Sequence, residues 1–221
     1  MLYLTLLTVL FVFNGAHSLD CRIVKQGQHF TSTLPFYGFK NESVISVRIQ
    51  FTESTARYLF PPTEINGRSC SQSWNAVWGS TRCGYLNSQL MDSDRFVWRR
   101  AGSCLQYDSQ GFVISERVDC AEADLVELAA SAYDNGLKPY QFSGILLKEF
   151  SAKLRINTWY KLQLTFEETK TVYQLSDDAN QVLEVQTVQH RSCPKFSSGA
   201  YQGLYFGGQC PAPQDVSVCY D

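Results

Sequence analysis

The sequence has little charge and few of the residues that most often carry chemistry. Asp, Glu, Lys and Arg make up 18% of its 221 residues, below the usual ~25%, and only three residues are histidine. The formal net charge of −2 removes any broad electrostatic reason for nucleic-acid binding. Because aromatic residues make up 14% of the chain, wholesale disorder is also excluded. These values predict a globular protein with one sizeable core.

Long hydrophobic runs are missing except at residues 2–13. That run is shorter than the ~20 residues needed to span a bilayer, but it fits the apolar centre of a secretory signal peptide. Small residues at Ala16 and Ser18 predict cleavage after Ser18, although the segment lacks the usual Lys or Arg. We expect residues 1–18 to be a signal peptide and residues 19–221 to form one secreted, extracellular domain without membrane insertion. The alternative for residues 1–18 is a buried N-terminal strand.

All eight cysteines follow the predicted cleavage point. An even number behind a signal peptide predicts four disulfides, whereas the absence of any C-x-x-C pair argues against a zinc site. The N-glycosylation sequon at Asn41 follows a turn-like segment, so glycosylation is predicted there. Many disulfide pairings are open; we favour one bond between the chain ends, Cys21–Cys219, and three short loops, Cys70–Cys83, Cys104–Cys120 and Cys193–Cys210.

Short strands are the dominant pattern. Residues 44–51 and 159–166 alternate apolar and polar side chains, and turns separate the second of these from strands at 171–175 and 181–188. This pattern predicts an antiparallel meander with one buried face. Residues 121–133 fit both a helix and a strand, and we favour the strand in an otherwise all-β chain. Further strands are expected at 95–99, 112–118, 144–150, 203–206 and 216–219.

The middle of the chain differs from the rest. Residues 65–111 are rich in Ser, Gly, Arg and Asn and lack periodic apolar positions, yet they contain three cysteines and three tryptophans. We interpret them as long disulfide-tied loops that contain short strands. Loops on a rigid β scaffold are where binding sites usually lie.

About twelve short strands in one domain fit a two-sheet antiparallel sandwich of the jelly-roll kind. The segments GLYFGGQCPAP at 203–213 and NTWYKL at 157–162 resemble concanavalin A-like and laminin G-like domains. The likeness covers roughly the last 65 residues and implies a fold shared by lectins, adhesion modules and polysaccharide-active enzymes. It also implies that calcium is the metal to consider. Asp92, Asp94 and Asp134 supply hard oxygen ligands at turn positions, although they match no family motif and backbone roles in turns are the favoured alternative.

Catalytic motifs are absent. No G-x-S-x-G occurs, and the E-x-D-x-E motif of laminarinase-type enzymes is missing. Tyr133, Lys138 and Tyr140 have the chemistry of a lyase site but are also ordinary loop residues. We therefore expect binding rather than catalysis, with no required cofactor.

The candidate binding residues lie between Cys70 and Cys104. Aromatic rings stack on the apolar faces of sugars, and planar polar groups pair with sugar hydroxyls, so we predict contacts from Trp74, Trp78 and Arg82. Tyr133 and Tyr140 are next in order, and core packing is the alternative for each tryptophan. The arginines in RFVWRR at 95–100 either hold an acidic glycan or line the solvated face of an edge strand.

The sequence therefore predicts a secreted binding module whose partner is a glycan or an extracellular protein. Two alternatives stay open, a polysaccharide-active enzyme of the glycosidase or lyase type and a structural protein of an extracellular coat or matrix.

The secreted chain should begin at Leu19 and contain no free thiol. N-terminal sequencing and thiol labelling in denaturant measure both properties. Two or more reactive thiols per secreted molecule would contradict the four predicted disulfides.

Overall fold

The computed structural model describes residues 20–31, 36–58, 60, 64–65, 68–70, 73–83, 92–101, 105–107, 109, 113–116, 120–134, 145–190, 199–207 and 210–221. The predicted signal peptide at 1–18 and residues Cys104, Tyr140 and Cys193 lie outside these ranges. Strands dominate the described residues, and the helix α1 (Glu53–Ala56) is a single turn. Within these ranges, no helix has the length and apolar character needed to cross a membrane.

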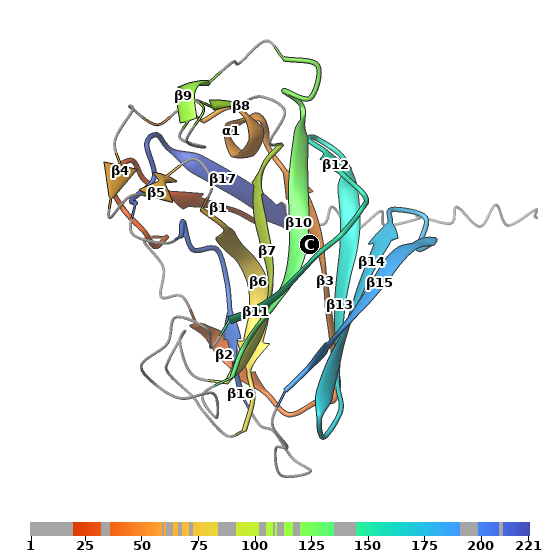
Figure 1. Ribbon diagram of the computed structural model, residues 1–221. Helices are drawn as coiled ribbons and strands as arrows, with labels where there is room; N and C mark the ends of the chain where they lie inside the picture. The colour runs from red at the N-terminus through yellow and green to blue at the C-terminus, as the bar shows by residue number, and fades with distance from the viewer. Residues whose placement is uncertain are drawn as a thin grey trace, which may run out of the picture.

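The chain folds as two antiparallel sheets that face each other, which confirms the predicted all-β jelly-roll sandwich (Figure 1). The six-stranded sheet has the order β1 (Asp20–Val24), β17 (Val216–Tyr220), β3 (Val44–Phe51), β13 (Trp159–Phe166), β14 (Lys170–Asp177) and β15 (Val182–Gln189).

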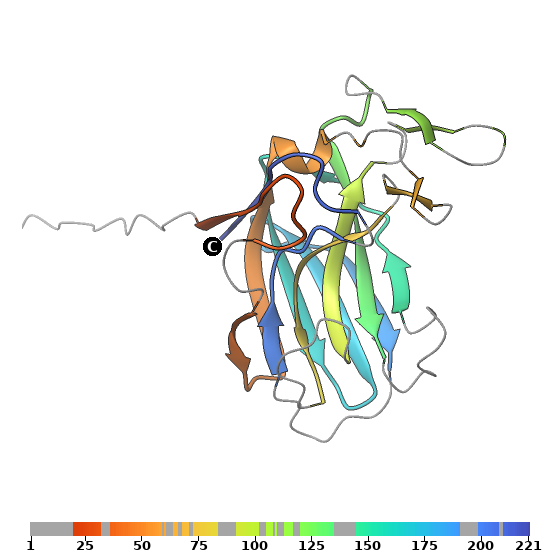
Figure 2. The ribbon, with the colours of Figure 1, turned by 90° about the vertical axis from the view of Figure 1, so that its left-hand side faces the viewer.

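The seven-stranded sheet has the order β11 (Ile145–Glu149), β10 (Leu125–Tyr133), β7 (Ser93–Arg100), β6 (Asn75–Thr81), β16 (Gly199–Gln202) and β2 (Phe36–Lys40), with β12 (Leu154–Arg155) also paired to β10. Two small ribbons lie at the end of the sandwich near α1 (Figure 2). They are β4 (Glu64–Ile65) with β5 (Arg68–Ser69), and β8 (Leu105–Tyr107) with β9 (Val113–Glu116).

The meander forms as its alternation predicts. Tyr160, Leu162, Leu164 and Phe166 of β13 are all buried, and the strand pairs with β14. Alternate residues of a strand point to opposite faces, so these four side chains enter the space between the sheets. Side chains of the facing sheet complete this core, among them Phe96, Trp98 and Leu128.

The ambiguous segment at 121–133 contains strand β10. The segment forms a strand although it contains good helix formers, because β10 is hydrogen-bonded to β7 on one side and to β11 and β12 on the other. Its alternating apolar residues are fully buried in the core: Val126, Leu128, Ala130 and Ala132.

The middle of the chain corrects the prediction of disulfide-tied loops. Residues 75–81 and 93–100 form β6 and β7, the central pair of the seven-stranded sheet. Every residue of β6 is buried, and all but one residue of β7 are buried. A strand buried on both faces need not alternate, so the periodicity that reveals half-buried strands is missing here.

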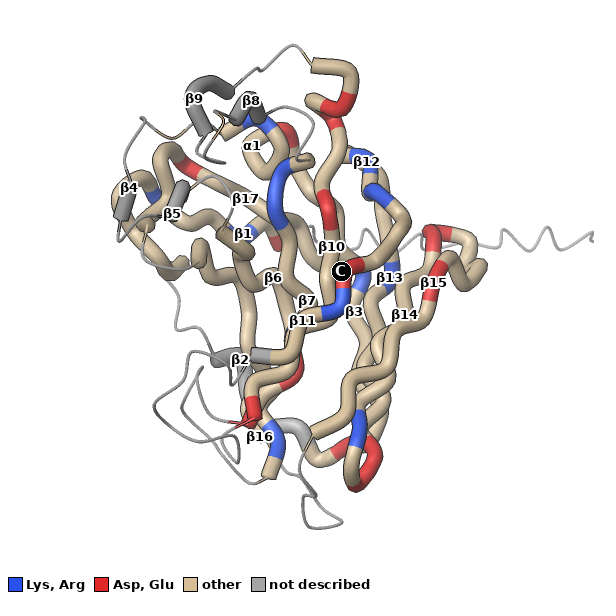
Figure 3. The backbone as a smooth tube through the Cα atoms, viewed as in Figure 1, with Lys and Arg blue, Asp and Glu red and all other residues tan. Residues whose placement is uncertain are grey.

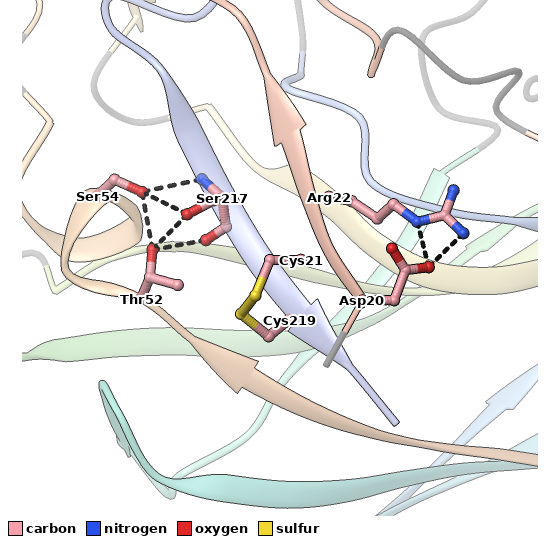
Figure 4. Close-up of a disulfide and its surroundings, with 7 residues drawn as sticks. All are labelled: Asp20, Cys21, Arg22, Thr52, Ser54, Ser217 and Cys219. Atoms are coloured by element: carbon pink, nitrogen blue, oxygen red, sulfur yellow. Dashed lines mark hydrogen bonds and ion pairs between the residues drawn. A yellow bond between two sulfur atoms is a disulfide. The ribbon is translucent and has the colours of Figure 1, made fainter. Parts of the chain in front are cut away.

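The disulfides confirm one predicted pair and correct two. Cys21 and Cys219 are bonded and lie opposite each other on β1 and β17, beside a hydroxyl cluster of Thr52, Ser54 and Ser217 (Figure 4). Cys70 is bonded to Cys210 instead of Cys83, which also excludes the predicted Cys193–Cys210 pair. Cys83 and Cys120 are disulfide-bonded as well, and the described residues include no free cysteine.

Replacing Leu164 by Ala should lower the free energy of unfolding by roughly 2–5 kcal/mol, because the side chain is fully buried and its loss leaves a cavity. Chemical denaturation measures the change. Val185→Ala is the control, because Val185 is 48% exposed and its truncation should change stability by less than about 0.5 kcal/mol. Equal effects of the two substitutions would contradict this description of the core.

Candidate functional site

Arg82 was predicted to contact a ligand, but it lies in the core with a relative exposure of 1%. Its Nε donates to Oδ2 of Asp94 at 2.8 Å, and its Nη2 donates to the carbonyl oxygen of Tyr133 at 2.7 Å. Burial of a charged group is costly unless it is paired, so Arg82 and Asp94 stabilise each other. Arg82 therefore lies in the core and not on an exposed loop.

Asp94 also receives two hydrogen bonds from the six-stranded sheet. The hydroxyls of Thr171 and Tyr173 donate to its carboxylate at 2.9 and 2.8 Å. Burial, followed by the neighbouring Asp94, raises the pKa of Tyr173 well above its usual value of 10.0, so the phenol remains a donor. The cluster therefore joins the two sheets through charged and polar groups.

Trp78 also lies in the core and not on the predicted binding surface. It is 6% exposed and stacks on Phe96, with ring centroids 6.4 Å apart. Trp98 is fully buried in the same core. Core packing, the alternative considered from the sequence, is what the structure shows for both tryptophans.

The candidate calcium ligands do not converge on a metal site. Asp94 is occupied as described, and Asp92 is fully buried with its Oδ1 atom 3.7 Å from Nη1 of Arg82. Both carboxylates therefore lie beside the guanidinium of Arg82. Asp134 is buried after β10, and no group of three or more His, Cys, Asp or Glu side chains able to hold a metal occurs in the described ranges.

The remaining predicted residues have mixed placements. Tyr133 is half-buried at the end of β10, and Tyr140 lies outside the described residues. Asn41 is exposed between β2 and β3, where glycosylation is sterically open, and its modification stays a prediction. Trp74 is half-buried just before β6 and is the predicted ligand-binding residue that best fits a surface role.

Charged and aromatic side chains gather instead on the side of the seven-stranded sheet that faces away from the core, here called the outer face. The alternation of β7 turns Asp94, Phe96 and Trp98 inward, so Arg95, Val97 and Arg99 point outward. Register then places the other members of the outer face: Trp74, Ala76 and Gly79 near β6, Glu127, Ala129 and Ser131 on β10, and Tyr205 beside Ala76.

Trp74, Arg99 and Glu127 form a connected row across this face. The guanidinium of Arg99 lies over the ring of Trp74, 4.3 Å from its centroid, and its Nε donates to Glu127 at 2.7 Å. Nη2 of Arg99 also lies 3.5 Å from Glu149 on β11. Figure 3 shows the basic end of β7 near α1 with an acidic position beside it on β10. Arg99 thus holds the indole ring and is balanced by two carboxylates.

Three aromatic rings adjoin this row on the side of β6 away from β7. Tyr205 stacks with His29 at 5.6 Å and lies against Phe30 at 4.9 Å, measured between ring centroids. Tyr205 is half-buried, whereas Phe30 is 44% exposed. Trp74 and Tyr205 both pack against the small side chains Ala76, Val97 and Ala129. Aromatic and charged groups are thus presented together on one sheet.

Sequence reasoning found part of this surface. It identified Trp74 and considered the arginines of RFVWRR, but β7 is a central strand and not the edge strand considered then. Arg95 and Arg99 belong to the outer face, whereas Arg100 is buried and donates to the carbonyl oxygen of Tyr58. Glu127 and Tyr205 were missed, because only the register of β10 and the bridge from Tyr205 to Ala76 bring them to this face.

No family model matches this sequence, and no curated protein matches it. Among solved structures, alginate lyases from Klebsiella pneumoniae and a Chlorella virus are similar in fold, with TM-scores of 0.48 and 0.47 and identities of 8% and 11%. The alignments cover 80% and 91% of this chain and 56% and 81% of theirs. The chain therefore spans little more than half of the Klebsiella enzyme.

A Bacteroides ovatus mixed-linkage glucan GH16 protein aligns with a TM-score of 0.41 and 9% identity, over 94% of this chain and 80% of its own. The LG1-3 region of the laminin alpha2 chain and lectin I from Ulex europaeus follow with TM-scores of 0.36 and 0.32. These concanavalin A-like and laminin G-like proteins are of the class that the terminal segments resemble. Their likeness concerns the fold alone.

Replacing Asp94 by Asn should lower the free energy of unfolding by roughly 3–5 kcal/mol, because it leaves the buried Arg82 without its closest counter-charge. Urea denaturation at neutral pH measures the change. Asp178→Asn removes an exposed partner of Arg48 and should cost less than about 1 kcal/mol. A small effect at Asp94 would show that the cluster does not hold the sheets together.

Proposed function

We propose that the chain is a secreted extracellular module that binds a glycan on the outer face of the seven-stranded sheet. The observation that carries this proposal is the row of Trp74, Arg99 and Glu127 beside the ring of Tyr205. It offers half-buried aromatic rings and planar polar groups on a rigid support.

The chemistry of a sugar suits this arrangement. One face of a pyranose carries mainly C–H groups and gains from contact with an aromatic ring, whereas its hydroxyls need donors and acceptors. Arg99 supplies donors and Glu127 supplies acceptors, and their mutual pairing fixes both side chains before a ligand arrives. Such preorganisation reduces the entropy that binding must overcome.

Secretion is supported by the disulfides. Two bonds are defined in the described residues, and they close long sequence separations of 198 and 140 residues. Disulfides form and persist in oxidising compartments, which agrees with the predicted signal peptide at 1–18. The exposed sequon at Asn41 is consistent with passage through the same compartments.

The fold alone does not separate binding from catalysis, because unrelated activities share it. A polysaccharide-active enzyme would release new chain ends from a bound polymer, and a purely structural coat or matrix protein without a ligand site would bind no glycan. The same binding screen, followed by an assay for product ends, separates the three functions.

The test uses the purified secreted protein on a glycan array, with and without a chelator, followed by titration of the strongest ligand. Trp74→Ala should weaken that binding about fivefold, which corresponds to roughly 1 kcal/mol for an aromatic contact. The melting temperature of the variant should stay near that of the wild type, since Trp74 is only half-buried.

Trp159→Ala is the matched control. Trp159 is half-buried and lies under the guanidinium of Arg48 at 5.2 Å, but it belongs to β13 in the other sheet. Its removal deletes the same kind of pair and should leave affinity unchanged. Equal losses in the two variants, or no glycan bound by the wild type, would overturn the proposal.

A further inference from the structure

Arg95 occupies the centre of the outer face. It lies in the middle of β7, opposite Gly79 on β6 and Ser131 on β10. A Cβ atom on Gly79 would come within 2.8 Å of Cγ of Arg95 and 2.1 Å of the carbonyl oxygen of Asp94. Glycine at position 79 therefore leaves the space through which the stem of Arg95 passes over β6.

The side chain of Arg95 is largely desolvated, and no counter-ion contacts it within the part of the chain that the structure describes. The residue is 8% exposed, and its Nε is buried without a hydrogen-bond partner. Among the described residues, no ion pair or hydrogen bond reaches this side chain. Its neighbour Asp94 points to the opposite side of the sheet, where it is held by Arg82.

Three other arginines of this region each have at least one polar partner, although Nη1 of Arg82 and Nε of Arg100 are also buried without a hydrogen bond to a described residue. Arg82 has Asp94, Arg99 has Glu127, and Arg100 donates to the carbonyl oxygen of Tyr58. A buried charge without a partner costs several kcal/mol, and an arginine cannot escape this cost by losing its proton. Burial does lower the pKa of Arg95 from its usual value, but the side chain stays cationic.

The residues opposite Arg95 on the neighbouring strands are uncharged, and the charged groups around Arg99 balance one another. Ser131 and Gly79 carry no charge, and burial raises the pKa of the nearby Tyr205, although Arg95 itself acts in the opposite direction. The acidic groups of the outer face, Glu127 and Glu149, are both engaged by Arg99. An anionic ligand at Arg95 would therefore meet an uncompensated positive charge.

We infer that Arg95 binds an anionic group of the ligand, so that the glycan of the proposed function is an acidic polysaccharide. The guanidinium presents its donors in a planar fork that matches the oxygens of a carboxylate or a sulfate. Uronic acids carry the first group and sulfated sugars the second, and both complete the same buried pair. This inference rests on the proposed function and adds the substrate class to it.

The test measures the affinity of the secreted protein for four polymers at fixed ionic strength: a polyuronate, the same polyuronate after reduction of its carboxyl groups, a sulfated glycan and its desulfated form. The wild type should bind one acidic polymer at least about tenfold more tightly than its matched neutral form. Whether the polyuronate or the sulfated glycan shows this preference identifies the anionic group.

Arg95→Gln should abolish the preference while leaving affinity for the neutral polymer unchanged. Its melting temperature should stay equal to or rise above that of the wild type, because an unpaired buried charge is removed. Arg48→Gln is the control for non-specific attraction: it removes one positive charge from β3 in the other sheet and should keep the preference.

Three results would overturn the inference. If the wild type binds acidic and neutral polymers equally, the substrate class is wrong and the glycan-binding function stands. If it binds none of the four and no array glycan, both proposals fail. If Arg95→Gln keeps the preference, or melts well below the wild type, Arg95 has a structural role and the anionic group is held elsewhere.

Discussion

The carboxylate of Asp94 is the point on which both sheets depend at one end of the sandwich. It accepts from Arg82 in its own sheet and from Thr171 and Tyr173 in the facing sheet. Burial of apolar side chains determines which face of β7 points inward, and the buried carboxylate adds a second requirement, because it is satisfied only where its donors lie. The ionic cluster therefore selects one alignment of β7 within a core whose stability comes mainly from burial of apolar side chains.

Fixing Asp94 inward also fixes what faces outward. Side chains of a strand alternate with a period of two, so a slip of one residue would send Arg95 and Arg99 into the core and Phe96 into solvent. With Asp94 held by three donors, the outward sequence of β7 is Arg95, Val97 and Arg99. The candidate site is thus a consequence of the interior polar cluster, although none of its residues is shared with that cluster.

The parts of the fold that the sequence predicts are the strands that have one face exposed to solvent. The sequence of strand β13 reveals which of its residues are buried, because Leu162 and Leu164 alternate with Lys161 and Gln163. Nearly all residues of strands β6 and β7 are buried, so the sequence shows no regular alternation there, and polar residues in them, such as Asp94, resemble loop residues. The Cys70–Cys210 bond is hidden from the sequence for a related reason, because only the fold brings these two residues, 140 positions apart, together.

The candidate site shows how far residue type alone can be trusted. Four arginines near β7 have the same chemistry in the sequence, yet the sheet gives each a different environment: Arg82 is paired in the core, Arg100 is held by a backbone carbonyl, Arg99 spans Trp74 and Glu127, and Arg95 is buried alone. The sequence predicts a ligand contact from Arg82, but the register of three strands is needed to show that Arg95 is the arginine without a partner among the described residues. Burying a cation without a counter-ion raises the free energy of the folded protein, and an anion bound there would lower it by pairing with that cation.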